Sequence, residues 1–522
     1  MFKISTLQRV VWWPSITSLI LGLFLFSGCA SVDFDTPKSE SYALTDTQET
    51  SFGLAAQRVQ VKHPGESGFS LLIDGIDSLA ARIILAEQAE RCIDAQYYLI
   101  SNDEVGYAFI NVLLRAADRG VRVRLLIDDI QTKGYDTGIA ALTSHPHVEV
   151  RVFNPFARRG WRFFDGLTDF SRVNRRMHNK SFTVDHLITI VGGRNMSDEY
   201  FGANSDEDFG DLDVVAVGPV VADVSEMFDS YWNSRPAVPV AGFAKSPDDL
   251  PAELLALRAR IDASYQELLK SPYAEALGQK VTEIFGADGS HLIWAASRLA
   301  YDSPDKAQKG LAESAPSILT PLVASIRAAE EELVLISPYF VPTKRGVKGL
   351  IELKERGVKV IVVTNSLAAN NQPIVHGGYA KSRRALLEAG VRLYEVSPDA
   401  TSGVEASVPV GAKKGTLHAK AFVVDRKELF IGSFNFDPRS AYINTELGVI
   451  IESPEMAAGL VALLHQKGPA HTYEVYLDAK GRLRWKRLEA GEWVVYDKEP
   501  NTGFWKRLTA RVMGWLPIES QL

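Results

Sequence analysis

The sequence predicts an α/β protein built from two similar halves, and three observations carry this prediction. The chain has 522 residues, more than one hydrophobic core organises, so at least two packed units are expected. The patterns at residues 82–100 and 113–129 recur at 326–340 and 350–365. In each copy a helical pattern runs into an apolar strand. This alternation indicates mostly parallel sheets flanked by helices.

Composition is ordinary for a folded protein. Hydrophobic residues make up 46% and charged residues 23%, values that exclude a disordered chain, a collagen-like repeat and a disulfide scaffold. The formal net charge is 57 − 64 = −7, so the chain as a whole does not attract nucleic acid. This balance counts against a nuclease and against nucleic acid as a partner.

Residues 1–28 are predicted to be a secretory signal. Lys3 and Arg9 are its only charges, and the apolar run from Ile16 to Phe26 is too short to span a bilayer as a helix. An uncleaved N-terminal anchor is the alternative. Either form tethers the protein to a membrane on the side away from the cytoplasm.

The signal ends in Ser27-Gly28-Cys29, which resembles a bacterial lipobox. The resemblance implies cleavage before Cys29 and lipid on its sulfur, which would anchor the chain in the cell envelope facing the periplasm. Ala30, rather than Asp, follows the cysteine and favours the outer membrane within that resemblance. The choice between inner and outer membrane stays open.

The remaining chain divides by pattern into five parts. Its two halves are separated by an Ala/Leu/Glu-rich stretch and followed by a two-stranded pattern. The parts are a flexible tether (29–66), a first half (67–240), a helical connector (241–285), a second half (286–470), and a C-terminal hairpin with an amphipathic helix (471–522).

Each half carries the same polar residues at the same spacing. In both, Lys follows His by two residues, Asp follows Lys by five and Asn follows His by 17. Two copies of this spacing are a strong signal. The first set is His178, Lys180, Asp185, Gly192, Gly193 and Asn195; the second is His418, Lys420, Asp425, Gly432, Ser433 and Asn435.

This spacing brings the polar side chains together. Residues two apart on a strand point to the same face, so each His shares a face with its Lys. The glycines let the backbone turn closely and return Asn beside them. An imidazole, an ammonium and a carboxamide together suit one phosphate group. If the two halves pack face to face, both sets meet in one pocket.

With its duplicated His-x-Lys-x4-Asp motif, the chain resembles the phospholipase D superfamily. Longer segments resemble the C-type cardiolipin synthase branch, from about residue 68 to near the C-terminus. The resemblance implies two phospholipase D-like halves with the active site between them. The segments include Asn-Arg-Arg-Met-His-Asn-Lys-Ser-Phe-Thr-Val-Asp (174–185), Ile-Ser-Pro-Tyr-Phe-Val-Pro-Thr (336–343) and Gly-Ser-Phe-Asn-Phe-Asp-Pro-Arg-Ser (432–440).

The resemblance also implies roles for the motif residues. His178 would attack phosphorus and form a phosphohistidine, while His418 would protonate the leaving alcohol and then deprotonate the acceptor. The lysines and asparagines of both motifs would neutralise the phosphoryl oxygens, so neither metal nor organic cofactor is expected. Asp185 and Asp425 would be mainly structural.

Two further acids are predicted to orient the histidines. Aligning the strands that end at Gly218-Pro219 and Ser453-Pro454 pairs Asp211 with Glu446. A nucleophilic histidine needs its second nitrogen held, and these acids could hold it. The alternatives are that both are solvated acids at strand ends, and that Asp213 takes the place of Asp211.

Two segments combine basic and aromatic residues. Residues 151–180 hold eight Lys or Arg and two Asp or Glu, interleaved with aromatic rings that include Trp161, Phe163 and Phe170. Near the C-terminus, apolar residues from Phe504 to Trp515 recur at helical spacing among basic ones. Both segments could meet a membrane surface. The alternatives are local core for the first segment, which is the more frequent role of such aromatics, and docking on the second half for the C-terminal helix.

The leading functional hypothesis is a phosphatidyltransferase that makes cardiolipin at a membrane. Phosphatidylglycerol would be the acceptor, and phosphatidylethanolamine is an alternative donor. Hydrolysis of phospholipid to phosphatidic acid by the same site is the second hypothesis. A nuclease of the same superfamily is the third, and both the duplication within one chain and the acidic net charge count against it. A non-catalytic lipoprotein that binds anionic lipid is a further alternative, from a different class of function.

Overall fold

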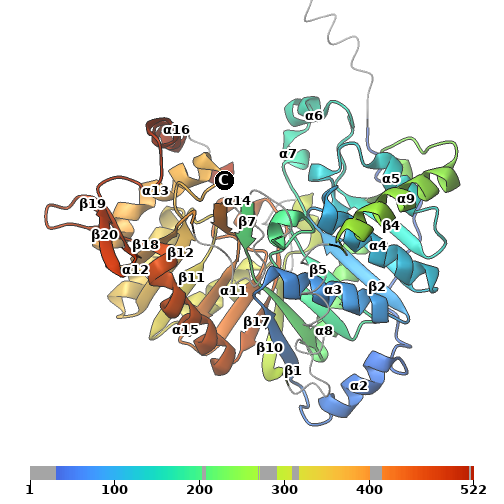
Figure 1. Ribbon diagram of the computed structural model, residues 1–522, viewed down its shortest axis with the longest axis horizontal. Coiled ribbons are helices and arrows are strands. Elements are labelled where there is room, and N and C mark those ends of the chain that lie inside the picture. The colour runs from blue at the N-terminus through green and yellow to red at the C-terminus, as the bar shows by residue number, and fades with distance from the viewer. Residues whose placement is uncertain are drawn as a thin grey trace, which may run out of the picture.

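The computed structural model describes residues 31–202, 207–268, 270, 291–308, 317–399, 414–515 and 519–521. The predicted signal, Cys29, Ala30 and the connector residues 269 and 271–285 lie outside the described residues. Two α/β halves lie next to each other, the first running from blue to green and the second from yellow to red (Figure 1).

The first half is built on a mixed sheet. Strands β2, β3 and β4 pair in parallel, and β5, β6, β8 and β1 continue the sheet from β2 in antiparallel steps. Strand β9 borders β4. The strands are β1 (Ser67–Leu72), β2 (Cys92–Tyr97), β3 (Arg122–Asp128), β4 (Val148–Phe153), β5 (Ser181–Val184), β6 (Ile188–Gly192), β8 (Asp213–Val217) and β9 (Ala237–Pro239).

The second half repeats this plan. Strands β11, β12 and β13 are parallel, and β15, β16, β17 and β10 follow β11 in antiparallel steps. Pairing of β1 with β10 joins the two sheets, in the register Gly68↔Trp294. The strands are β10 (Ile293–Tyr301), β11 (Glu332–Ile336), β12 (Lys359–Asn365), β13 (Arg392–Val396), β15 (Ala421–Val424), β16 (Glu428–Gly432) and β17 (Leu447–Glu452).

The expectation of mostly parallel sheets was wrong, because the motif segments form hairpins. Asp185 and His186 between β5 and β6 both have positive φ, 51° and 54°, and Asp425 and Arg426 repeat this with 51° and 52°. Two consecutive residues of this kind make a tight hairpin turn, which reverses the chain. A parallel step would need a long crossover that these segments lack.

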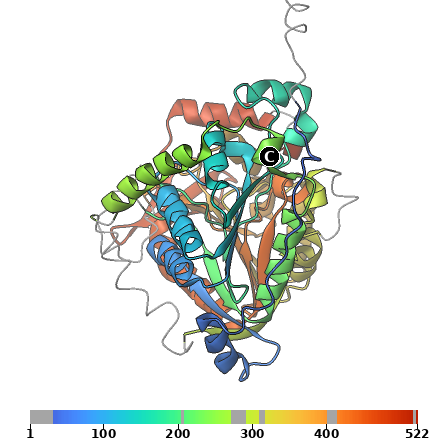
Figure 2. The ribbon, with the colours of Figure 1, turned by 90° about the vertical axis from the view of Figure 1, so that its right-hand side faces the viewer.

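Helices cover the sheets and meet in a shared core. Valines and aromatics of α8 pack with β1 and β8 in a core cluster that also contains residues of β10, β17 and α15 from the second half. Helix α9 packs on α4 and α5 at the outer face of the first half (Figure 2). The helices of the first half are α3 (Gly75–Gln88), α4 (Glu104–Asp118), α5 (Asp136–Leu142), α6 (Arg162–Thr168), α7 (Phe170–Val173), α8 (Pro219–Trp232) and α9 (Leu250–Leu268).

Residues 31–66 differ from the flexible tether that was expected. They lie along the first half and include α2 (Ser51–Gln60), which Thr50 caps. The buried side chains of Arg124 and Arg151 donate hydrogen bonds to the carbonyl oxygens of Ser41 and Ser39. Buried guanidinium groups need such acceptors, which explains why this polar segment is held in place.

The C-terminal hairpin extends the second sheet. Strand β18 (Thr472–Leu477) pairs with β13, followed by β19 (Leu483–Glu489) and β20 (Glu492–Tyr496). The helices of the second half are α11 (Leu319–Arg327), α12 (Lys344–Glu355), α13 (Pro373–Glu388), α14 (Pro438–Tyr442), α15 (Pro454–His471) and α16 (Phe504–Trp515). No helix within the described ranges is long and apolar enough to cross a membrane.

Helix α16 docks on α13 of the second half. The two helices approach so closely at Gly377 that a β-carbon there would lie 2.6 Å from the carbonyl oxygen of Ala510. Gly514 completes this contact. Docking therefore accounts for the inner side of α16, while its outer side remains exposed.

Candidate active site

A short strand pair between the halves brings Asp211 to His418. Strand β7 (Glu207–Gly210) pairs in parallel with β14 (Lys414–Leu417), and the next residues along the chain are Asp211 and His418. The backbone N–H of His418 donates to the carbonyl of Gly210 at 2.8 Å. Nδ1 of His418 then lies 2.5 Å from Oδ2 of Asp211.

The same arrangement occurs with the halves exchanged. Met177 forms a parallel bridge with Thr445, and the N–H of His178 donates to the carbonyl of Thr445 at 2.9 Å. Nδ1 of His178 lies 2.9 Å from Oε2 of Glu446. Each histidine is therefore held by the carboxylate of the other half, and both motifs form one site.

Asp213, the rival of Asp211, serves a different purpose. Its carboxylate accepts from Ser78 at 2.7 Å and from Arg82 at 3.0 Å, and it pairs with Arg194 at 3.4 Å. These contacts fasten helix α3 to the sheet. Asp213 thus belongs to the scaffold beneath the site rather than to a histidine.

Small residues beneath the histidines make room for the carboxylates. A β-carbon on Gly193 would lie 2.2 Å from Oδ1 of Asp211, so only glycine fits there. Ser433 stands at the equivalent position, and its hydroxyl donates to Oε2 of Glu446 at 2.5 Å. Gly192 and Gly432 are equally crowded: a β-carbon would lie 2.0 Å from the carboxylate of Asp213 and 2.3 Å from the carbonyl of Leu447.

Both motif lysines are buried beside their histidines. Nζ of Lys180 donates to the carbonyl oxygen of His178 at 2.5 Å, and Nζ of Lys420 lies 2.6 Å from Nδ1 of His418. Burial lowers the pKa of Lys420 to about 8 and that of Lys180 well below the ordinary lysine value. A desolvated ammonium interacts more strongly with an anion than a hydrated one does.

Burial favours the neutral form of both histidines. Burial lowers the pKa of His178 to about 4, and Lys180 and Lys420 act in the same direction. Burial and Lys420 lower the pKa of His418 to about 3. With Nδ1 held by a carboxylate, each ring presents an unprotonated Nε2, the form that can attack phosphorus or accept a proton.

The motif asparagines complete the polar lining. The side-chain amide of Asn195 donates to the Tyr200 hydroxyl at 2.8 Å, whereas it is the backbone N–H of Asn435 that donates to Oγ of Ser440, at 3.3 Å. In both asparagines the buried Oδ1 has no hydrogen-bond partner among the described residues. A carboxamide can rotate to exchange its O and N, so these ends are available to a ligand.

Three aromatic rings surround the histidines. The sequence did not predict any of them. Tyr98 lies edge-on to His178 with ring centroids 4.9 Å apart. Phe209 stacks on His418 at 5.4 Å, and the Tyr200 hydroxyl is 3.4 Å from Nε2 of His418. None has a counterpart at a repeated motif position, so the sequence carried no signal for them.

The motif aspartates lie at the hairpin turns, away from the histidines. Asp185 accepts hydrogen bonds from the N–H groups of Glu90, Arg91 and Cys92. Asp425 accepts from Glu330, Glu331 and Glu332 in the same manner. Each carboxylate therefore ties its motif hairpin to the neighbouring strand.

The site as a whole is equipped for a phosphodiester. It contains two imidazoles, two lysine side chains and two amides, with the carboxylates already engaged by the histidines. Within the described part of the chain, no group of three or more His, Cys, Asp or Glu is placed to hold a metal ion. Among the side chains of the site, the lysines and asparagines carry the N–H donors that could hold a phosphate.

Comparison with known proteins places the chain in a family. The family described as "Cardiolipin synthase, PLD-like domain" matches residues 83–232 and 322–466. Cardiolipin synthase C of Escherichia coli (strain K12) is 43% identical over 467 residues, 88% of this chain and 97% of the relative. The chain belongs to the cardiolipin synthase family of the phospholipase D superfamily.

Other relatives of this cardiolipin synthase family member extend the comparison. An uncharacterized protein of Helicobacter pylori (strain ATCC 700392 / 26695) is 31% identical over 94% of this chain and 96% of its own. The crystal structure of phosphatidylserine synthase from Haemophilus influenzae Rd KW20 superposes with a TM-score of 0.52 at 14% identity, covering 80% of this chain and 92% of that one. This likeness shows that the two-half fold is shared.

Proposed function

We propose that this chain makes cardiolipin by transferring a phosphatidyl group to a hydroxyl of phosphatidylglycerol. The observation that carries the proposal is the reciprocal pairing of His178 with Glu446 and of His418 with Asp211. It creates one site with two oriented, neutral imidazoles. Similarity to cardiolipin synthase C over 97% of that relative's length supports the choice of product.

In the first step, Nε2 of His178 attacks phosphorus and the bond to the leaving alcohol breaks. Binding of the anionic phosphodiester raises the proton affinity of His418, which then gives a proton to the leaving oxygen. Lys180 and Lys420 balance the charge that builds on the phosphoryl oxygens, and their burial strengthens this effect.

In the second step, His418 removes the proton from the glycerol hydroxyl of phosphatidylglycerol. The oxygen attacks the phosphohistidine, the P–N bond breaks, and His178 returns to its neutral form. Asp211 and Glu446 orient the two rings through both steps. Phosphatidylglycerol or phosphatidylethanolamine would serve as the donor, and water in place of the acceptor would give phosphatidic acid.

The proposal also covers the location of the protein, which we infer to be the bacterial cell envelope. The cardiolipin synthase relationship implies phospholipid substrates and hence work at a bacterial membrane. Lipid on Cys29 after removal of residues 1–28 would anchor the chain facing the periplasm, and Ala30 favours the outer membrane. Loss of acylation in a Cys29→Ser variant, measured by mass spectrometry of the intact protein, tests this anchor.

Lipid mass spectrometry on the purified full chain tests the reaction. Vesicles contain phosphatidylglycerol, with and without phosphatidylethanolamine, and His178→Ala serves as the inactive control. Cardiolipin formed only by the active protein supports the proposal, and its dependence on the second lipid identifies the donor. Phosphatidic acid alone would make the protein a phospholipase D. No turnover of either lipid would contradict the proposal and favour a lipid-binding role.

A further inference from the structure

Two groups of exposed apolar side chains stand out on the surface. The α6–α7 cluster consists of Trp161, Phe163, Leu167 and Phe170, which are 53–73% exposed. The α16 cluster consists of Phe504, Trp505, Val512 and Trp515, which are 44–77% exposed. Single exposed apolar residues are common, but groups dominated by large aromatic rings indicate a contact surface.

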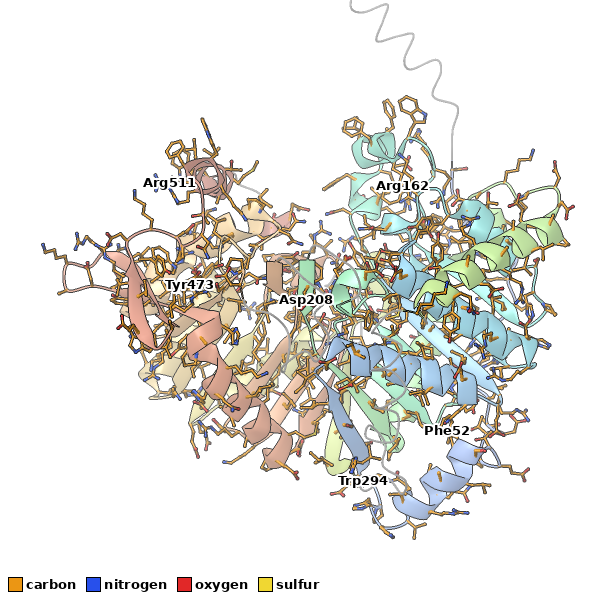
Figure 3. All side chains as sticks on the ribbon, in the orientation of Figure 1. Phe52, Arg162, Asp208, Trp294, Tyr473 and Arg511 are labelled. Carbon is orange, nitrogen blue, oxygen red and sulfur yellow. The ribbon has the colours of Figure 1, made fainter. Side chains whose placement is uncertain are left out.

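The two clusters lie on the same side of the molecule. In Figure 1, α6 and α16 both project upward, one from each half, and Figure 2 shows the same from a perpendicular view. Figure 3 places Arg162 beside the first cluster and Arg511 beside the second, with ring side chains pointing outward from both helices. The clusters therefore form one discontinuous face, contributed by both halves.

Chain topology puts this face at the edge of the sheets that carries the histidines. Helices α6 and α7 lie between the end of β4 and His178. Helix α16 packs near the start of α13, which follows β12, and Nζ of Lys506 donates to the carbonyl of Ala368 in that connection. The side chains of Asn174, next to α7, and Gln521, past α16, are joined at 2.8 Å. The active site thus lies beneath and between the two clusters.

The charges around the clusters favour an anionic surface. Residues 504–515 contain Lys506, Arg507 and Arg511 and no acid. In the α6–α7 segment acids and arginines neutralise one another, as Asp165 does with Arg158 and Asp169 with Arg172, so no unpaired acid opposes an anionic surface there and the positive charge comes from α16. Arg507 and Arg511 form no ion pair with a described residue, so α16 carries positive charge beside its exposed rings. Aromatic rings beside cations are typical of protein surfaces that enter the headgroup region of an anionic bilayer.

We propose that the α6–α7 and α16 clusters form a membrane-docking face that inserts into the headgroup layer of an anionic phospholipid bilayer. Docking would hold the site against the bilayer, so that a phosphodiester could reach the histidines while its acyl chains stay in the membrane. Access of a phosphodiester to the histidines rests on the proposed function, whereas docking of the face on a bilayer does not. Since the proposed Cys29 lipid would tether the chain in any orientation, the face would set the orientation.

The test compares paired variants of the full chain. Trp161→Ser with Phe163→Ser removes the tip of the first cluster, and Trp505→Ser with Trp515→Ser removes that of the second. The control is Trp493→Ser with Val495→Ser on β20, which removes two apolar side chains that are each 54% exposed and lie outside both clusters. Circular dichroism melting of all variants reports whether folding is unchanged.

Two measurements decide the outcome. Cardiolipin formation is measured on vesicles of phosphatidylglycerol and phosphatidylethanolamine, and on short-chain phosphatidylglycerol kept monomeric in solution. Each cluster variant should lose at least about 10-fold of the vesicle rate, because removing two interfacial rings weakens insertion, and should keep the rate on monomers within about twofold. Tryptophan quenching by brominated phospholipids should fall in the same variants but not in the control.

Several results would overturn the docking face. Equal losses on vesicles and monomers would place the rings in the site or the fold. Unchanged vesicle rates and quenching would mean that the face meets something other than a bilayer, such as a protein. If the parent protein makes no cardiolipin, the quenching still reports insertion, so a failure of the proposed function is distinguishable from a failure of the docking face.

Discussion

Oε2 of Glu446, in the second half, holds Nδ1 of His178, in the first half, at 2.9 Å. Asp211 and His418 repeat this contact in the opposite direction. Because each ring depends on the other half, neither half contains a complete His–carboxylate pair. The duplication is therefore more than two copies of one site, since both copies are needed to build it.

Replacing Glu446 with Gln is expected to lower kcat by about 10²- to 10⁴-fold, the range of a lost acid–base contribution. Gln keeps the size of the side chain but removes the charge that orients His178 and stabilises its cationic form. Cardiolipin formation on vesicles measures the loss. Glu452→Gln, at the exposed end of strand β17, which begins directly after Glu446, is the control and should retain full activity, because surface ion pairs contribute little.

A burst experiment tests whether His178 is the nucleophile and His418 the general acid and base. With phosphatidyl-p-nitrophenol, whose leaving group needs no proton, His418→Ala should release a stoichiometric burst and retain a phosphatidyl group on His178. His178→Ala should give no burst. Peptide mapping after a quench that avoids acid locates the adduct. An adduct on His418 in the parent protein would reverse the assignment.

Gly193→Ala should disable the site without touching a motif side chain. The new methyl group would lie 2.2 Å from Oδ1 of Asp211 and would push that carboxylate from His418. Overpacking of this kind costs about 1–3 kcal/mol of stability, and activity should fall further than stability accounts for. Urea unfolding and the cardiolipin assay measure the two effects. Gly459→Ala, in α15 with open space around it, is the control expected to keep both.

The alkaline side of the pH profile should report Lys420. Its ammonium is charged below its lowered pKa of about 8 and neutral above it, so kcat/KM should fall as the pH rises through about 8. Lys420→Arg keeps a cation at high pH, and its residual activity should lack this fall. Lys427→Gln, which removes an exposed lysine, should keep it. An unchanged profile in Lys420→Arg would assign the titration to another group.

The residues of the site that occur at matching positions in both halves could be predicted from the sequence alone. His178 and His418 stand at equal spacing from their partners, and matched strand ends pointed to Asp211 and Glu446. The sequence could not reveal that the pairs cross between halves, because that depends on the pairing of β7 with β14, two short strands whose own sequences do not resemble each other. The rings of Tyr98 and Phe209 depend on the same packing.

Local pattern also misled where tertiary contacts decide the structure. Strand β5 was expected in a mostly parallel sheet, but its turn at Asp185 and His186 reverses the chain. Residues 31–66 have no apolar periodicity, yet the buried guanidinium groups of Arg124 and Arg151 hold part of this segment through backbone carbonyls. Neither the hairpin turn nor the contacts of residues 31–66 alter the hydrophobic pattern, which is the main structural signal available from one sequence.

Asp185 is expected to stabilise the fold without taking part in the reaction. Asp185→Asn should destabilise the folded protein by about 1–3 kcal/mol, because its buried carboxylate accepts three backbone N–H groups that an amide satisfies poorly. The rate per folded molecule should stay within about twofold, since the acid lies at a hairpin turn rather than at a histidine. Urea unfolding and active-site titration with phosphatidyl-p-nitrophenol measure these separately. Asp223→Asn, an exposed acid on α8, is the control expected to change neither, and a large loss of rate in Asp185→Asn with normal stability would place this aspartate in the chemistry.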